Sequence, residues 1–253
     1  MAHPDLQAFC LFASYGRSGH SLVGSLLDAH PDVVIAHEAN ALRLVAEGTK
    51  RDELFRTLLE NSRRSFERGR RQSGYSYVVE GQWQGRYRTL RVIGDKSGGR
   101  TTKLIGRAGL RRFARTVGLP LRIVHQTRNP YDIVARRSLV LRDGVPKRTI
   151  EEATADLAAM TDVNERLIRE GKYPVITLRH EALIAEPQGE LARLCEFVGV
   201  EPESDYLDAC AGIVYESPHR TRDRVEWSDA QLSAVDEIVA RHHFLRGYSF
   251  DGY

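Results

Sequence analysis

The thirty residues from Phe9 to Glu38 constrain the fold more than any other part of the chain. They read FCLFASYGRSGHSLVGSLLDAHPDVVIAHE. An apolar run is followed by a glycine-containing loop, a helical pattern that ends at Pro31, and a second apolar run at 33–36. This order predicts a strand, loop, helix, strand unit whose two strands are parallel and joined by a right-handed crossover.

The loop between the first strand and the helix has the composition of an anion site. Gly16 and Gly19 relax the backbone, and Ser18 and Ser21 offer hydroxyl donors. Arg17 supplies a cation that can hold two oxygens at once. Backbone N–H groups and the dipole of the helix add positive charge at the same place. The sequence therefore predicts a phosphate or sulfate site, and a phosphorylated nucleotide as its ligand.

Two other kinds of glycine loop fit this sequence less well. A P-loop that binds nucleoside triphosphates needs GxxxxGK followed by Ser or Thr, but His20 stands where the lysine should be. A dinucleotide fingerprint needs GxGxxG, whereas the glycines here are Gly16, Gly19 and Gly24; only Glu38 imitates its acidic residue. An ordinary glycine turn without a ligand stays open as an alternative.

The loop and its helix resemble those of the sulfotransferases that use 3′-phosphoadenosine 5′-phosphosulfate (PAPS). In that family a loop of the pattern Lys/Arg-Ser-Gly-Ser/Thr-Ser/Thr binds the 5′-phosphosulfate end, and RSGHS fits four of five positions. The longer string through LLDAHP is especially similar to the tyrosylprotein and carbohydrate branches. His20 lacks the usual hydroxyl, so only its main chain is expected to contribute. The resemblance implies that the donor's 5′ end is bound by Arg17, Ser18, Gly19, His20, Ser21 and Leu22.

A second segment, residues 121–138, extends the resemblance. An apolar strand ends in Arg128-Asn129-Pro130, and proline is well placed at a helix start. The family's Arg-Asp/Asn-Pro turn binds the 3′-phosphate together with a serine eight residues later, which implies this role for Arg128. Arg136 stands where that serine would be, and it could contact the phosphate more strongly than a hydroxyl. Ser138 lies about 200° around the helix from it. Which of the two serves the phosphate stays open, as does a solvated basic helix face.

A third segment, SPHRTRDRVEW at 217–227, resembles the family's late basic loop, which closes over the nucleotide. Arg220 stands seven residues before Trp227, as the family's arginine does, although the glycines of that pattern are missing. Arg222 is a secondary candidate. His180, which takes the place of a family tyrosine, is expected to stack on adenine or hydrogen-bond to it, with a core histidine as the alternative.

The resemblance also implies the catalytic groups. Glu38 resembles the glutamate that follows LLDAHP and is predicted to be the general base. Lys96 in GDKS resembles a lysine that acts on the bridging or sulfuryl oxygens, and Arg17 would neutralise the leaving 5′-phosphate. No metal is expected, because these cations and the backbone dipoles supply the positive charge. A capping or ion-paired Glu38 and a surface-turn Lys96 are the alternatives.

The order of predicted elements gives the fold class. Strands near 9–14, 33–36, 91–94, 122–127 and 174–178 alternate with helices, which predicts an α/β fold with three layers and a mostly parallel central sheet. The resemblance implies the P-loop NTPase-like sulfotransferase fold. The 253 residues, 42% of them hydrophobic, suffice for a single domain over 1–253. The segment 43–91 carries no motif and is interpreted as an acceptor-binding insertion with a hairpin near 75–90.

Composition limits the partners and the compartment. The net charge of +3 is too small to indicate nucleic-acid binding, and no apolar run is long enough to span a membrane. The arginine-rich patch at 63–71 is interpreted as a solvated helix face. Three cysteines without metal spacing suggest reduced thiols, so a cytoplasmic protein is expected. A small molecule, a carbohydrate or a peptide are the acceptors considered, and homo-oligomerisation is left open.

Three functions therefore compete at this stage. A PAPS-dependent sulfotransferase is the one that the three ordered motifs favour. An atypical nucleotide kinase on the same core would require magnesium and prefer ATP. A catalytically silent nucleotide-binding module would bind the nucleotide, but Glu38→Ala and Lys96→Ala would change no reaction.

Overall fold

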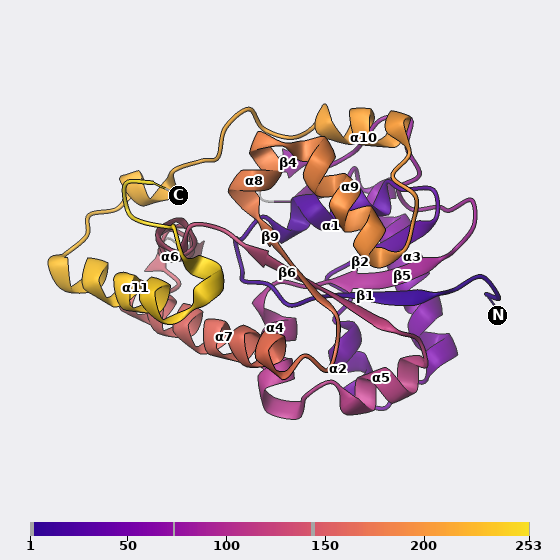
Figure 1. Ribbon diagram of the computed structural model, residues 1–253, viewed down its shortest axis with the longest axis horizontal. Coiled ribbons are helices and arrows are strands. Elements are labelled where there is room, and N and C mark those ends of the chain that lie inside the picture. Colours follow the sequence, from indigo (N-terminus) through magenta and orange to yellow (C-terminus); the bar gives the residue numbers. More distant parts are fainter. Residues whose placement is uncertain (1–2, 73, 143–144, 253) are drawn as a thin grey trace.

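A five-stranded parallel sheet forms the centre of the computed structural model, which describes residues 3–72, 74–142 and 145–252 (Figure 1). The strands lie in the order β2-β5-β1-β6-β9. All five predicted strands are confirmed, and so is the three-layer α/β class. Their bounds are β1 Ala8–Phe12, β2 Val33–His37, β5 Val92–Lys96, β6 Leu121–Thr127 and β9 Val175–Arg179.

The central strands are apolar because helices cover both faces of the sheet. In β1, Cys10 and Phe12 belong to one buried cluster, while Phe9 and Leu11 belong to another. Successive side chains of a strand point to opposite faces, so a strand between two helical layers has no polar side. The continuous apolar run at the start of the chain is the consequence.

The two helical layers are drawn from different parts of the chain (Figure 1). The face that carries Cys10 is covered by α1 His20–Asp28, α8 His180–Ala185, α9 Pro187–Val198 and α10 Ser204–Ala211. The other face is covered by α2 Ala41–Ala46, α3 Arg51–Glu67, α4 Gly99–Ala108 and α5 Arg111–Val117, with the end of α7 Ile150–Glu170.

A third buried cluster lies beyond the end of the sheet, where α6 Pro130–Ser138, α7 and α11 Asp229–Arg241 meet. Tyr131, Leu157 and Val235 are buried there, one from each of these helices. In Figure 1 this group lies to the left of the sheet, and α6 begins directly after β6. It forms one wall of the candidate site described below.

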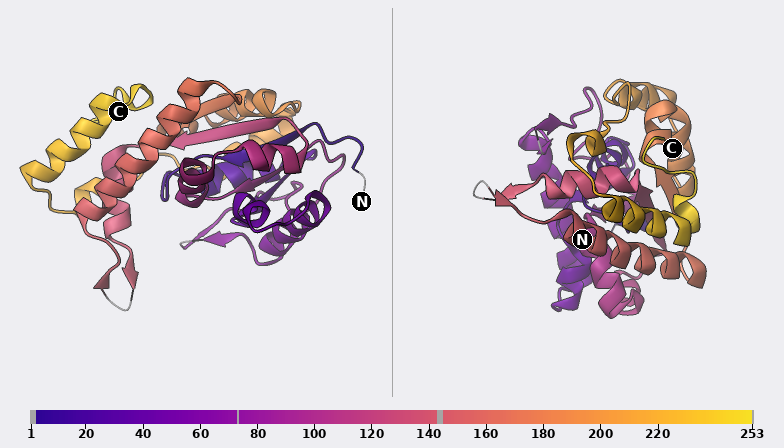
Figure 2. Two further views of the ribbon diagram at one scale, coloured as in Figure 1. Left: turned by 90° about the horizontal axis from the view of Figure 1, so that it is seen from below. Right: turned by 90° about the vertical axis from the view of Figure 1, so that its left-hand side faces the viewer.

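Two short hairpins depart from the layered core. One pairs β3 Arg71–Gln72 with β4 Tyr75–Ser76, and the other pairs β7 Leu141–Arg142 with β8 Val145–Pro146. The second projects from the body beyond α6 and α7 (Figure 2). A hairpin was expected near 75–90; it lies at 71–76 instead, and 77–91 follows without regular structure.

No helix in the described ranges is long and apolar enough to cross a membrane.

A buried ion pair fastens α1 to the segment after α3. Asp28, at the end of α1, accepts the N–H of Ile35 at 2.6 Å, the hydroxyl of Ser62 at 2.9 Å and the N–H of Gly85 at 3.1 Å. The guanidinium of Arg70 completes this shell, and its side chain is 2% exposed. The interpretation of the whole 63–71 patch as a solvated face is therefore wrong at Arg70.

Arg70→Ala should lower the free energy of unfolding by about 3–5 kcal/mol, because Asp28 would stay buried without its cation. Chemical denaturation at pH 7 measures this loss. Arg64→Ala is the matched control, since Arg64 forms an exposed pair with Glu60, and it should change stability by less than about 1 kcal/mol. Equal losses in the two variants would contradict the assignment.

Candidate functional site

The loops at the carboxyl ends of the strands surround one cavity of about 720 Å³. This is where ligands bind in open parallel sheets. The predicted residues that line it are Arg17, Gly19, His20, Ser21, Leu22, Glu38, Arg128, Arg136, His180 and Arg220. They come from segments up to 203 positions apart in sequence. Two further predicted residues, Ser18 and Lys96, are buried behind this wall.

The cavity wall is strongly cationic. Among its described residues, ten are Lys or Arg, and Glu38 is the one acid. A concave surface of one sign attracts a ligand of the opposite sign. The cations are Arg17, Arg100, Lys103, Arg128, Arg136, Arg137, Lys147, Arg148, Arg220 and Arg224. The wall therefore fits a ligand with several negative charges.

The loop before α1 presents its backbone to the cavity. Gly19 has φ 89° and Arg17 has φ 76°, both in the left-handed region. The hydroxyl and the N–H of Ser18 both donate to the carbonyl of Tyr15, at 2.9 Å and 3.2 Å. Ser18 thus shapes the turn and does not offer its hydroxyl to a ligand. Within the described part of the chain, the N–H groups of Gly19, His20 and Ser21 have no acceptor, which leaves a cradle for an anion.

Two histidines are packed against this loop as neutral rings. Burial lowers the pKa of His180 to about 3, and it lowers the pKa of His20 well below 6.5. The His180 ring lies against Gly19, and the His20 ring lies against Gly98. Both rings line the cavity, so each offers an uncharged aromatic surface between the surrounding cations.

The side chain of Lys96 extends from β5 past α1 to the anion loop. Its stem crosses α1 at Gly24, where an added Cβ would lie only 2.7 Å from Cγ of the lysine. Its Nζ lies 3.0 Å from the hydroxyl of Ser21 and 3.7 Å from Oε1 of Glu38. Burial lowers the pKa of Lys96 to about 8, against the raising effect of Glu38. The ammonium therefore joins the anion loop to the candidate base.

Glu38 is held in a strained backbone conformation, with φ 55°. Its N–H donates to the carbonyl of Lys96 at 2.8 Å. The buried carboxylate of Asp95 accepts the N–H groups of Ala39 at 3.0 Å and Ala41 at 2.8 Å, which fixes the turn immediately after Glu38. Burial raises the pKa of Asp95 to about 6. The Glu38 side chain itself is 31% exposed and faces the cavity.

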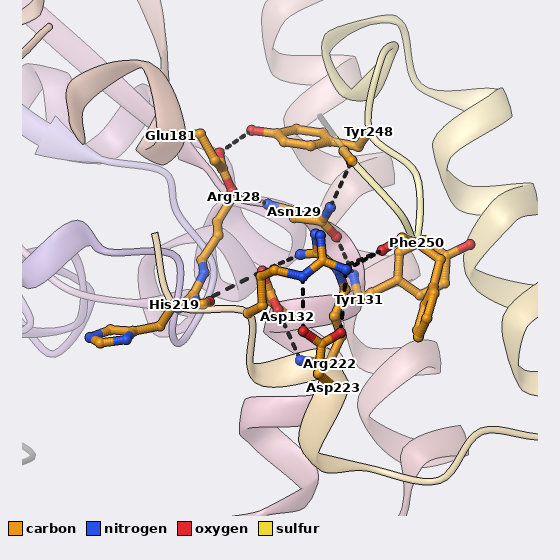
Figure 3. A network of polar contacts seen from close by, with 12 residues as sticks. Arg128, Asn129, Tyr131, Asp132, Glu181, His219, Arg222, Asp223, Tyr248 and Phe250 are labelled. Atoms are coloured by element: carbon orange, nitrogen blue, oxygen red, sulfur yellow. Dashed lines mark hydrogen bonds and ion pairs between the residues drawn. The ribbon is translucent and has the colours of Figure 1, made fainter. Parts of the chain in front are cut away.

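The turn at Arg128, which follows β6, is held by hydrogen bonds to neighbouring segments. The guanidinium of Arg128 donates to the carbonyl of Arg17 at 3.4 Å and to the carbonyl of His219. Glu181 accepts the N–H of Asn129 at 2.8 Å and the hydroxyl of Tyr248 at 2.7 Å (Figure 3). Arg128 therefore connects the anion loop to the segment 217–227, which contains His219.

The two candidates on α6, Arg136 and Ser138, are placed differently. Arg136 lines the cavity, whereas the hydroxyl of Ser138 donates to the carbonyl of Ala135 in its own helix. Arg220 also lines the cavity and pairs with Asp223 at 2.8 Å.

The secondary candidate Arg222 points elsewhere. It is buried in a 2.6 Å pair with Asp132, behind the wall (Figure 3). Its N–H also donates to Asp132 at 2.9 Å, and its Nε donates to the carbonyl of Phe250 at 2.6 Å. Arg222 thus fastens the segment that carries Arg220 to α6.

Several lining residues were not predicted from the sequence. Tyr75, Tyr77 and Tyr215 form an aromatic group, with ring centroids 5.5 Å apart for Tyr75 and Tyr215. Lys103 and Arg137 come from α4 and α6. An aromatic residue just before the late basic segment was a signal for Tyr215, but nothing in the sequence distinguishes Lys103 from other helical lysines.

None of the three cysteines lines the cavity. Cys10, Cys195 and Cys210 are buried and unpaired, as the sequence predicts. Residues 3–72, 74–142 and 145–252 contain no cluster of His, Cys, Asp and Glu arranged for a metal ion.

Comparison with known proteins agrees with this fold. A model of the sulfotransferase family matches residues 121–205, which include the Arg128 turn and His180. No curated protein matches the chain in sequence.

Solved structures match over nearly the whole chain. The sulfotransferase domain from the curacin biosynthetic pathway is 13% identical with a TM-score of 0.56, covering 95% of this chain and 98% of that one. The sulfotransferase domain of the Synechococcus PCC 7002 olefin synthase is 14% identical with a TM-score of 0.54, covering 94% of both. Sulfotransferase STF9 from Mycobacterium avium is 12% identical with a TM-score of 0.56, covering 99% of this chain and 79% of that one. The predicted resemblance to sulfotransferases is therefore confirmed for the fold and for residues 121–205.

Gly19→Ala should lower the free energy of unfolding by about 2–4 kcal/mol, because φ 89° strains a side chain and the new methyl group collides with the His180 ring. Gly16→Ala is the matched control in the same loop. A methyl group there meets no atom within 4 Å, and stability should stay within about 1 kcal/mol of the wild type. Chemical denaturation compares the two. A Gly19→Ala protein as stable as the control would mean that the loop differs from the one described.

Proposed function

We propose that this protein transfers a sulfuryl group from PAPS to a hydroxyl or amine acceptor by in-line displacement, with Glu38 as the general base. The observation that carries the proposal is the direct link between two cationic elements in one cavity. The Arg128 guanidinium contacts the main chain of Arg17, so the anion loop and the Arg128 turn are neighbours. A nucleotide phosphorylated at both ends of its ribose fits such a pair.

The donor's ends are assigned from this geometry. The 5′-phosphosulfate would lie in the cradle of N–H groups that begins at Gly19, beside Arg17. The 3′-phosphate would lie near Arg128, Arg136 and Arg220, which also line the cavity. The adenine would contact an uncharged ring, and His180 between these two regions is such a surface.

The chemistry assigns a role to each group around the sulfur. As the acceptor oxygen attacks, the bond from sulfur to the bridging oxygen breaks, and the acceptor proton passes to Glu38. Lys96, 3.7 Å from that carboxylate, would stabilise charge on the bridging or sulfuryl oxygens. Arg17 would neutralise the departing 5′-phosphate. Positioning and fixed charges supply the catalysis, and we propose that no metal is required.

The segment 43–91 contributes to this site at one place. Its helix α3 buries Leu54, Phe55 and Leu58 against the sheet, so that part serves as covering layer. Tyr75 and Tyr77 reach the cavity wall. We propose that these two tyrosines are the part of the segment that contacts a bound ligand.

Adenosine 3′,5′-bisphosphate should bind without magnesium, and Arg136→Gln should weaken its binding about 10–100-fold. Arg136 suits the test because it is half-buried on the cavity wall and no hydrogen bond or ion pair joins its side chain to another described residue. Calorimetry measures the binding, with ATP and magnesium as the comparison. Arg241→Gln removes an exposed charge at the end of α11 and should leave affinity unchanged.

Two outcomes would contradict this part of the proposal. Tighter binding of magnesium-ATP would favour the kinase reading. Equal effects of the Arg136 and Arg241 substitutions would show that the 3′-phosphate does not lie beside Arg136.

Glu38→Gln should keep the affinity for the nucleotide and abolish sulfuryl transfer. Unchanged transfer would exclude Glu38 as the general base.

The pH dependence of kcat/KM should show an alkaline limb near pH 8, because burial lowers the pKa of Lys96 to about 8 and only its ammonium form stabilises the sulfuryl oxygens. The same shift has the opposite effect on stability. Between pH 8 and the pKa of 10.5 in the unfolded chain, the unfolded state binds more protons, so the contribution of Lys96 to stability rises with pH. Activity that falls while the fold persists would identify Lys96. A flat kcat/KM profile from pH 7 to 9.5 would contradict its role.

A further inference from the structure

The cavity wall contains more cations than the proposed contacts to the donor use. The proposed contacts to the nucleotide use the anion loop, Arg128, Arg136 and Arg220. Six other lining cations lie outside that set: Arg100, Lys103, Arg137, Lys147, Arg148 and Arg224. This surplus calls for a ligand group of its own.

Three of these cations form a cluster around one carboxylate. Lys103 comes from α4, Arg137 from α6, and Arg148 from the segment between β8 and α7. All three pair with one carboxylate, Asp156 of α7; the distance for Arg148 is 3.6 Å. Burial raises the pKa of Asp156, but the hydrogen bond and charge of Lys103 and the charge of Arg137 outweigh burial and hold that pKa below its usual value. The single negative charge of Asp156 is thus shared by three cations, so the cluster has a net positive charge.

Arg137 supplies independent evidence for a missing partner. Its side chain is 8% exposed, and Nη1 is buried without a hydrogen-bond partner among the described residues. A buried guanidinium N–H without an acceptor is unfavourable unless a ligand satisfies it. Arg137 also lines the cavity. An anion in the cavity beside Arg137 would both complete its hydrogen bonding and balance the charge of the cluster.

The position of the cluster favours the acceptor over the donor. Helix α4 begins at Gly99, three residues after Lys96, and so belongs to the part of the site that holds Lys96 and Glu38. Met160 of α7 lines the cavity against Gly99. The cluster therefore lies on the wall formed by α4, α6 and α7, and α4 follows the strand that carries Lys96.

We infer that Lys103, Arg137 and Arg148 form a subsite for an anionic group of the acceptor, which would carry a carboxylate, sulfate or phosphate on the same molecule as the hydroxyl to be modified. This inference rests on the proposed sulfuryl transfer. It selects acidic acceptors from the sugar, phenol and peptide hydroxyls that the sequence leaves open.

The test uses acceptor pairs that differ only in a carboxylate. 4-Hydroxyphenylacetate is compared with its amide, and methyl glucuronide with its amide. Binding to protein saturated with adenosine 3′,5′-bisphosphate is measured by calorimetry, and transfer from labelled PAPS is measured in parallel. In at least one pair the acid should bind at least tenfold more tightly and show the same preference in kcat/KM.

Lys103→Gln is the matched variant, because it removes one cation and leaves Arg137 paired with Asp156. It should reduce the preference for the acid about tenfold, through KM, while the affinity for the bisphosphate changes less than twofold. Arg107→Gln, one turn further along α4, exposed and outside the cavity lining, should leave the preference intact. Arg148→Gln repeats the test from a second element.

The outcomes separate the inference from the proposed function. Equal binding of acid and neutral partner in every pair would overturn the anionic subsite, even if transfer proceeds. A loss of bisphosphate affinity in Lys103→Gln would overturn it too, because the cluster would then belong to the donor. Failure of the wild type to bind the bisphosphate at all would instead contradict the proposed function.

Discussion

Electrostatic repulsion among cations is the constraint around which this end of the molecule is built. The parallel sheet places the loops at one edge, and the cavity there has ten basic residues against one carboxylate on its described wall. The acids that pair with these cations do not line the cavity: Asp132 lies near Arg128, Asp156 pairs with Arg137, and Asp223 pairs with Arg220. These acids hold the basic side chains in place but leave a net positive charge on the cavity wall. A polyanionic ligand would reduce the repulsion among the cations.

Two charged groups next to the candidate base Glu38, Lys96 and Asp95, are buried. Lys96 is an ammonium with a lowered pKa, placed between the anion loop and Glu38. Asp95, the preceding residue in β5, fixes the backbone after Glu38. One strand therefore helps to set the distance between the anion loop and Glu38, so the sheet contributes to that geometry.

The sequence was sufficient where the signal is local. Apolar runs, glycine spacing and the Arg128-Asn129-Pro130 turn predicted all five strands, and the anion loop, Glu38, Arg128, His180 and Arg220 do surround one cavity.

What the sequence could not show depends on which way a side chain turns in three dimensions. Ser18 bonds within its own turn, and Arg70 is buried on Asp28. The Asp156 cluster joins three elements that no sequence spacing relates.

A crystal structure of the protein with adenosine 3′,5′-bisphosphate would locate both phosphates. We expect the 5′-phosphate against the backbone N–H groups of Gly19 to Ser21, and the 3′-phosphate within hydrogen-bond distance of Arg128 or Arg136. A nucleotide bound with its phosphates away from both elements, or reversed between them, would contradict this expectation.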